Sequence, residues 1–230
     1  MEKAEKTVVP VARIRSDFPQ KFGIPRQSSL ARTRAEIHFE PEFRSAEAVR
    51  ELEKFSWIWL IWGFSKNEDA PWHPTVRPPR LGGNKRVGVF ASRSPFRPNG
   101  LGLSSVRLLK IDFDSPDSPV LIVEGADLAD GTPIYDIKPY LSFCDSHPDA
   151  AGSYTDTHPR KHLSVCFPDR LIGVFPEEKR QGLLDLLAED PRPSYQNDPE
   201  RIYGLSFAGY NIKFTVSEDT LTVTDIQKCD

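Results

Sequence analysis

The run SWIWLIWGF, from Ser56 to Phe64, sets the architecture that we expect for this chain. It is nearly continuous in aromatic, β-branched and other apolar residues, and it has the length of one strand. Such a run is typical of a strand that is covered on both faces. It is far shorter than the roughly 20 apolar residues that span a bilayer. We therefore expect a central strand in the core of a globular protein.

Several other short strands flank this run, and Gly, Pro, Asn and Asp separate them. Close spacing of short strands with turn residues between them predicts an antiparallel or mixed β-barrel. A short amphipathic helix is expected from Ser45 to Phe55, just before the aromatic run. The expected strands are Thr7–Ile14, which Pro10 interrupts, then Arg86–Ser92, Gly102–Phe113, Val120–Glu124 and Ile134–Ile137.

The texture of the sequence changes after about residue 150. A strand is expected around His162–Phe167, and a helix over Pro176–Ala188 with a leucine stripe. Three further runs predict a closing sheet: Leu205–Gly209, Tyr210–Val216 and Leu221–Ile226. We predict a β-barrel domain over residues 1–155 and a small C-terminal α+β domain over residues 156–230.

The composition is that of an ordinary globular protein. The chain has 230 residues, 38% of them hydrophobic and 27% charged, and a formal net charge of −3. That balance argues against indiscriminate coating of nucleic acid but leaves room for a local basic face. The N-terminal sequence lacks an apolar signal core, so we expect a cytoplasmic protein. Three widely spaced cysteines without a CxxC motif predict reduced thiols.

One stretch concentrates positive charge. From Pro71 to Lys110 there is no Asp or Glu, while Arg and Lys recur among Pro, Gly, Asn and Ser. Arginines on fixed turns are suited to phosphates and carboxylates. The alternative is a basic patch that has no partner. The cations are Arg77, Arg80, Lys85, Arg86, Arg93, Arg97, Arg107 and Lys110.

Several common site classes are excluded by spacing. Neither GxGxxG nor GxxxxGK[ST] occurs, which removes the best evidence for a doubly wound nucleotide-binding fold. No serine lies in a GxSxG elbow. His158, His162 and Cys166 have helical ligand spacing, but Pro159 argues against a helix there, so we expect no metal site.

Two segments have both a structural and a functional interpretation. Asp130-Gly131-Thr132-Pro133 can be a simple turn, or it can lead to functional side chains at the mouth of the barrel. Asp190-Pro191-Arg192-Pro193 can be a helix stop, or it can present Arg192 and Tyr195 outward for phosphate contact and base stacking.

Taken together, a series of motifs resembles the TrmO family, also called TsaA-like. The order and spacing match from near residue 7 to near residue 215. One departure is Gly100, where the family often has proline. The motifs are Pro25-Arg26-Gln27, Arg77-Pro78-Pro79-Arg80, the segment 88–99, Asp130-Gly131-Thr132-Pro133, Asp136-Ile137-Lys138-Pro139-Tyr140 and the segment 190–195.

The resemblance implies an S-adenosylmethionine-dependent methyltransferase that acts on N6 of N6-threonylcarbamoyladenosine at position 37 of tRNA. It also implies a single-sheeted β-barrel with a small C-terminal α+β domain, working as a homodimer. The cofactor site it implies comprises Pro25, Arg26, Gln27, Ser65, Lys66, Arg93, Leu128, Asp130, Gly131, Thr132 and Pro133.

Methyl transfer from a sulfonium needs alignment more than acid or base, although N6 must still lose a proton. We expect Asp136 or Tyr140 to accept that proton. The residues expected to grip the anticodon arm are Arg77, Arg80, Lys85, Arg86, Arg97, Lys138, Arg192 and Tyr195. Two alternatives remain open: a tRNA-binding barrel without turnover, and a methyltransferase for a small molecule.

Overall fold

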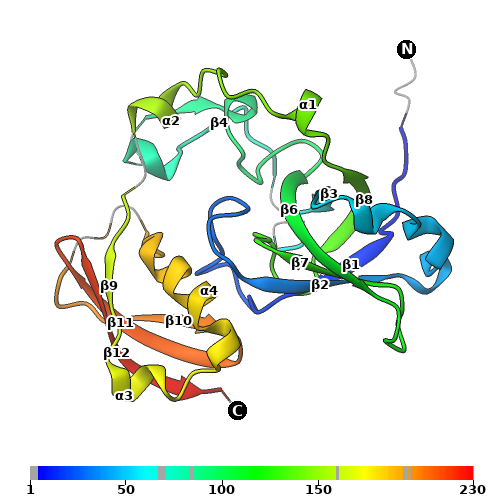
Figure 1. Ribbon diagram of the computed structural model, residues 1–230. Helices are drawn as coiled ribbons and strands as arrows, with labels where there is room; N and C mark the ends of the chain where they lie inside the picture. Colours follow the sequence, from blue (N-terminus) through cyan, green and yellow to red (C-terminus); the bar gives the residue numbers. More distant parts are fainter. Residues whose placement is uncertain are drawn as a thin grey trace.

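The computed structural model of the protein describes residues 5–66, 71–82, 85–158, 161–193, 196 and 198–229. Within these residues six strands close into one antiparallel barrel, which confirms the predicted barrel (Figure 1). Around the barrel their order is β1 (Ala12–Arg15), β2 (Arg34–Phe39), β7 (Val120–Glu124), β6 (Leu101–Asp112), β3 (Trp57–Gly63) and β8 (Pro133–Pro139).

Strand β3 pairs with β6 on one side and β8 on the other, as a central strand should. Its side chains alternate: Ile58, Leu60 and Trp62 are buried in the barrel, whereas Trp59 and Ile61 on the outer face are only half-buried. The prediction that both faces are covered is therefore wrong for the outer face. Large apolar side chains remain accessible there, beside a cavity described below.

The segment before β3 also differs from the prediction. The expected helix from Ser45 to Phe55 is wrong, because the segment forms two short 3₁₀ turns, η2 (Ala46–Val49) and η3 (Leu52–Lys54). Glu51 between them has a φ of +70°, which a right-handed helix cannot accommodate. Another 3₁₀ turn, η1 (Pro41–Phe43), precedes them.

Within the basic stretch, the segment Arg86–Ser92 consists mostly of turns rather than the strand expected there. Only β5 (Val87–Gly88) is extended, paired with β4 (Thr75–Val76), and a 3₁₀ turn follows at once. The 3₁₀ turns here are η4 (Pro79–Leu81) and η5 (Val89–Ala91). Two short helices, α1 (Ser142–Asp145) and α2 (Tyr154–Thr157), follow the barrel.

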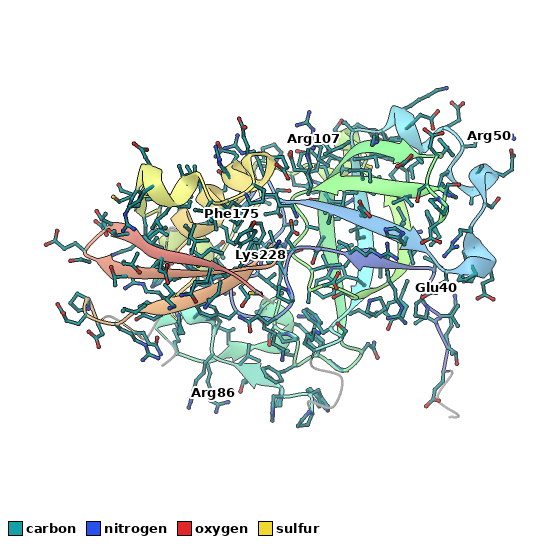
Figure 2. All side chains as sticks on the ribbon, turned by 90° about the horizontal axis from the view of Figure 1, so that it is seen from below. Glu40, Arg50, Arg86, Arg107, Phe175 and Lys228 are labelled. Carbon is teal, nitrogen blue, oxygen red and sulfur yellow. The ribbon has the colours of Figure 1, made fainter. Side chains whose placement is uncertain are left out.

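A second, smaller sheet has the order β10–β11–β12–β9, with β9 parallel to β12 and the other pairs antiparallel. The helix α4 (Glu177–Ala188) covers it with Leu183, Leu186 and Leu187, and Phe175 lies between helix and sheet (Figure 2). The remaining elements are β9 (Ser164–Cys166), α3 (Asp169–Ile172), β10 (Tyr203–Phe207), β11 (Tyr210–Ser217) and β12 (Thr220–Lys228).

The loop between β1 and β2 leaves the barrel and packs against this second unit (Figure 1). Phe18 and Ala31 belong to the core beneath α4. Asp17 pairs with Lys179 at 2.6 Å, and Arg32 binds Asp185 of α4 through both its side chain and its amide. The two hydrophobic cores are thus not divided by one point along the sequence. The predicted boundary near residue 156 stays a prediction.

Candidate active site beside strands β3 and β6

A cavity of about 610 Å³ lies where the β1–β2 loop and the basic stretch meet the outer faces of β3 and β6. Its volume is within the range of small-molecule sites. The structure brings many of the predicted cofactor residues together in its wall. These are Pro25, Arg26, Gln27, Ser65, Lys66, Arg93 and Thr132.

The other predicted cofactor residues support the wall without lining it. Leu128 is buried, and its carbonyl accepts a hydrogen bond from the Ser16 hydroxyl at 2.9 Å. Asp130 accepts from the Ser16 amide, also at 2.9 Å. Gly131 has a φ of +76° and Pro133 is buried at the start of β8. Together they form the turn that directs Thr132 to within 3.3 Å of the Ser65 hydroxyl.

Two arginines connect this cavity to its surroundings. Arg93 donates to the side-chain oxygen of Gln27, and the Gln27 amide donates to the carbonyl of Arg26. Arg26 in turn donates to the backbone carbonyl of Arg192, 3.1 Å away. The β1–β2 loop, the basic stretch and the second unit therefore meet at one edge of the cavity.

The sequence did not reveal Asp127, which also lines the cavity. Trp62 donates its indole N–H to Ser104 Oγ at 3.0 Å, and Ser104 donates to Asp127 Oδ1 at 2.6 Å. Burial raises the pKa of the Asp127 carboxyl, although the Ser104 hydrogen bond and the Arg93 charge oppose this. The available signal was one acidic residue between buried apolar neighbours in the run Gly125 to Ala129.

A second cavity, of about 1070 Å³, adjoins the first and shares Arg26, Gln27, Ser92, Arg93 and Pro95 with it. Two more arginines, Arg77 and Arg86, contribute to its wall. Its aromatic residues are His73, Phe90, Phe96 and Tyr154. Phe90 is 74% exposed, so most of its ring is accessible from the second cavity or from solvent.

In Figure 2, Arg86 projects from the basic stretch at the edge of the molecule, far from Arg50 on the barrel. Arg86 donates to the Thr75 hydroxyl at 2.9 Å, which connects its side chain to β4. Cationic forks beside an exposed aromatic ring suit an unpaired nucleotide, which offers both a phosphate and a flat base.

Arg97 serves a different purpose from its neighbours, because it fixes the turn. Its guanidinium donates to the carbonyls of Val89 at 3.2 Å and Ser92 at 2.6 Å, and lies 5.7 Å from the Phe90 ring centroid. Gly100 closes the next turn with a φ of +58°, and its amide donates to the Arg97 carbonyl. Proline cannot adopt that φ, whereas glycine adopts it at no steric cost.

The predicted proton acceptors do not belong to the described walls of the two cavities. Asp136 pairs with Lys138 at 2.9 Å on the outer face of β8, and both side chains are about half exposed or more. Tyr140 packs against Trp59, with ring centroids 5.5 Å apart. Among the described lining residues of either cavity, none of these three is present.

The prediction that Arg192 points outward is wrong. Its side chain is 9% exposed and forms a two-pronged ion pair with Asp190, at 2.8 and 2.9 Å. Lys85 is exposed and outside the described walls of both cavities. The side chain of Arg80 and the residue Tyr195 lie outside the described part of the chain.

Two further searches give negative results for the described residues. No group of three His, Cys, Asp or Glu side chains there is placed to hold a metal ion. Nor does that part of the chain contain a helix with the length and apolar character needed to cross a membrane. The three cysteines are all exposed and unpaired.

Two family models match the sequence. The tRNA-methyltransferase O N-terminal domain matches residues 13–146, and the TrmO C-terminal domain matches residues 175–229. A tRNA (adenine(37)-N6)-methyltransferase of Escherichia coli K12 is 42% identical over 214 residues, covering 89% of this chain and 91% of that protein. A putative S-adenosylmethionine-dependent methyltransferase of Pseudomonas aeruginosa PAO1, RcsF, is 41% identical over 209 residues, covering 86% and 87%.

Solved structures agree with the sequence matches. A crystal structure of TrmO from Pseudomonas aeruginosa superimposes with a TM-score of 0.81 at 33% identity, covering 99% of each chain.

A further sequence relative, a probable S-adenosyl-L-methionine-binding protein of Methanothermobacter thermautotrophicus, is 36% identical over 146 residues. That match covers 64% of this chain and 98% of the archaeal protein.

Proposed function

Because the chain belongs to the tRNA-methyltransferase O family, we propose that it transfers a methyl group from S-adenosylmethionine to N6 of adenosine 37 in tRNA. The finer proposal is that this adenosine already carries an N6-threonylcarbamoyl group. One observation carries the proposal. The cavity that gathers the predicted cofactor residues opens, along a shared edge, onto the cavity with arginine and exposed aromatic walls.

The smaller cavity suits the cofactor chemically. Its apolar side, with Trp59, Ile61 and Leu103, offers a surface for a flat purine. The wall also carries Arg26 and Arg93, which suit the cofactor carboxylate. The cofactor supplies the activated methyl group, and the protein supplies alignment of that methyl with N6.

The larger cavity suits the target nucleotide and its neighbours. Arg77 and Arg86 can neutralise phosphates, and Phe90 presents a free ring face for an unstacked base. A threonylcarbamoyl group brings a further carboxylate, which can pair with Arg77 or Arg86 of the same wall. The roles predicted for Lys85, Lys138 and Tyr140 stay predictions.

The experiment is methyl transfer from labelled S-adenosylmethionine to tRNA prepared with and without the threonylcarbamoyl group. We expect label only on the modified tRNA, at adenosine 37. Absence of transfer to the modified tRNA, with a folded protein, contradicts the proposal. Transfer to both preparations supports the tRNA methyltransferase activity but contradicts the proposal that the substrate adenosine must carry a threonylcarbamoyl group.

The two alternative functions give different results. A binding barrel without turnover shows salt-sensitive tRNA affinity but no calorimetric signal with S-adenosylhomocysteine. A methyltransferase for a small molecule is indifferent to Arg86→Ala. We instead expect Arg86→Ala to weaken tRNA binding, with Arg50→Ala as the matched control, since Arg50 is 66% exposed and pairs with Glu47 on the barrel.

We further propose a cytoplasmic homodimer. Large apolar side chains outside both described cavity walls are exposed, among them Phe143 of α1 at 85% and Ile202 at 62%, and a second copy of the chain can cover such side chains. Light scattering coupled to size-exclusion chromatography measures the mass directly, and a monomer mass at working concentration contradicts the dimer.

A further inference from the structure

Methyl transfer to N6 needs an acceptor for the N6 proton in the wall of the cofactor cavity, because the sulfonium methyl and the nucleobase nitrogen must come into contact there. In the described walls of both cavities, Asp127 is the only carboxylate. Resting on the proposed function, we propose that Asp127 accepts the proton that N6 releases during the transfer. Nothing in the family comparison assigns a role to this residue.

The hydrogen bonds around Asp127 define the direction of proton donation. The indole of Trp62 is a donor only, so Ser104 Oγ accepts from it and must use its own proton toward Asp127 Oδ1. The carboxylate is thereby held as an acceptor, from β6, against the wall of the cavity. Ser104 itself is 2% exposed, so this arrangement is shielded from water.

The transfer balances with Asp127 as the acceptor. The N6 lone pair forms a bond to the methyl carbon while the carbon–sulfur bond breaks, and the electron pair stays on sulfur. The N6 proton passes to the Asp127 carboxylate, which becomes a neutral acid. After S-adenosylhomocysteine and the methylated tRNA leave, the acid returns the proton to solvent.

The surroundings make Asp127 a stronger base than a solvated aspartate. Burial raises its pKa, while the Ser104 hydroxyl, the charge of Arg93 and the backbone amides of residues 127 and 28 oppose the rise. The other charged groups in the wall of this cavity are Lys21, Arg26, Lys66 and Arg97. A carboxylate with a raised pKa removes a proton more effectively, provided that it is ionised at the working pH.

Asp127→Asn tests the assignment, because an amide oxygen still accepts from Ser104 but cannot take a proton. We expect single-turnover transfer to fall by about 10² to 10⁴-fold at saturating cofactor. Affinity for S-adenosylhomocysteine should stay within about threefold of wild type. Asp112→Asn, at the far end of β6, is the matched control and should retain the wild-type rate.

A pH profile separates proton transfer from a structural role. The wild-type rate should rise with pH along an acid limb whose pKa is above the ordinary aspartate value of about 4. Ser104→Ala removes a hydrogen bond that lowers the pKa of Asp127, so it should move this limb to higher pH. His73→Gln, in the second cavity, should leave the position of the limb unchanged.

Each contrary result overturns the inference in an identifiable way. A transfer rate for Asp127→Asn within about threefold of wild type removes Asp127 as the acceptor but leaves the proposed function. Loss of cofactor affinity with an unchanged rate at saturation makes Asp127 a binding residue. Loss of the acid limb in His73→Gln transfers the role to the imidazole. Absence of transfer by the wild-type protein instead contradicts the proposed function itself.

Discussion

Replacing Arg192 by alanine should destabilise the second unit rather than simply weaken RNA binding. Its guanidinium is 9% exposed and makes two charge-assisted hydrogen bonds to Asp190, whose side chain is 26% exposed. Breaking a fully buried ion pair costs about 3–5 kcal/mol, because one charge is left without a partner. Since water reaches Asp190, we expect a loss of about 1.5–3 kcal/mol, the range for hydrogen bonds to charged groups.

Urea unfolding measures this loss. With a slope of about 2 kcal/mol per molar urea, the midpoint should fall by about 1 M. Arg192→Lys keeps the positive charge but loses the planar guanidinium that makes two hydrogen bonds. Its urea midpoint should therefore lie between those of the wild type and Arg192→Ala. Arg50→Ala, an exposed arginine in a surface pair, should shift the midpoint by less than about 0.5 M. An unchanged midpoint for Arg192→Ala with a clear loss of tRNA affinity would refute the reasoning, and would support an outward-facing arginine.

Three further predictions concern the loops around the site. Gly100→Pro should destabilise the protein by about 3 kcal/mol in urea unfolding, since proline cannot adopt its φ of +58° and removes the amide that closes the turn. Gly23→Ala should cost about 1–3 kcal/mol in the same assay and weaken S-adenosylhomocysteine in calorimetry, because its Cβ would lie 1.9 Å from Leu205 Cδ1, just before the loop that lines the cavity. Burial alone would raise the pKa of Asp185, but the hydrogen bonds from Arg32 outweigh burial and hold the pKa below its usual value. The Arg32–Asp185 pair therefore stabilises the fold above about pH 4, and this stabilisation is lost as the pH falls further. Thermal unfolding of wild type and Asp185→Asn should therefore differ at pH 7, by about 1 kcal/mol, and converge near pH 2.

Strands and helices with a strong local pattern could be predicted from the sequence. The apolar run at β3, the strand Val120–Glu124 and the helix α4 agree with the structure within a residue or two, because hydrophobic spacing and Pro or Gly punctuation act locally. The segment Ser45–Phe55 has a helical pattern too, but its backbone follows the barrel surface instead, with Glu51 in the left-handed region.

The site could be predicted only in part, for a related reason. Motif positions such as Pro25–Gln27, Arg93 and Thr132 converge on one cavity although they are far apart in the sequence. Whether a particular charged side chain is buried depends on tertiary contacts that a local sequence pattern does not predict. Arg192 turns inward because Asp190, at a φ of +51°, folds back beside it. Asp127 becomes a buried carboxylate only when β6 brings Ser104 beneath it.

The loop between β1 and β2 makes chain order and folding order differ. Phe18 is buried in a core that is built mostly from residues after position 160, with its ring 5.4 Å from that of Phe207, and Asp17 and Arg32 form ion pairs with Lys179 and Asp185 of α4. A ribosome completes the barrel strands well before the partners of this loop have been synthesised. During that interval Phe18 has no core to pack into, because the barrel strands do not cover it. The core to which Phe18 belongs is completed only when the second unit has been synthesised.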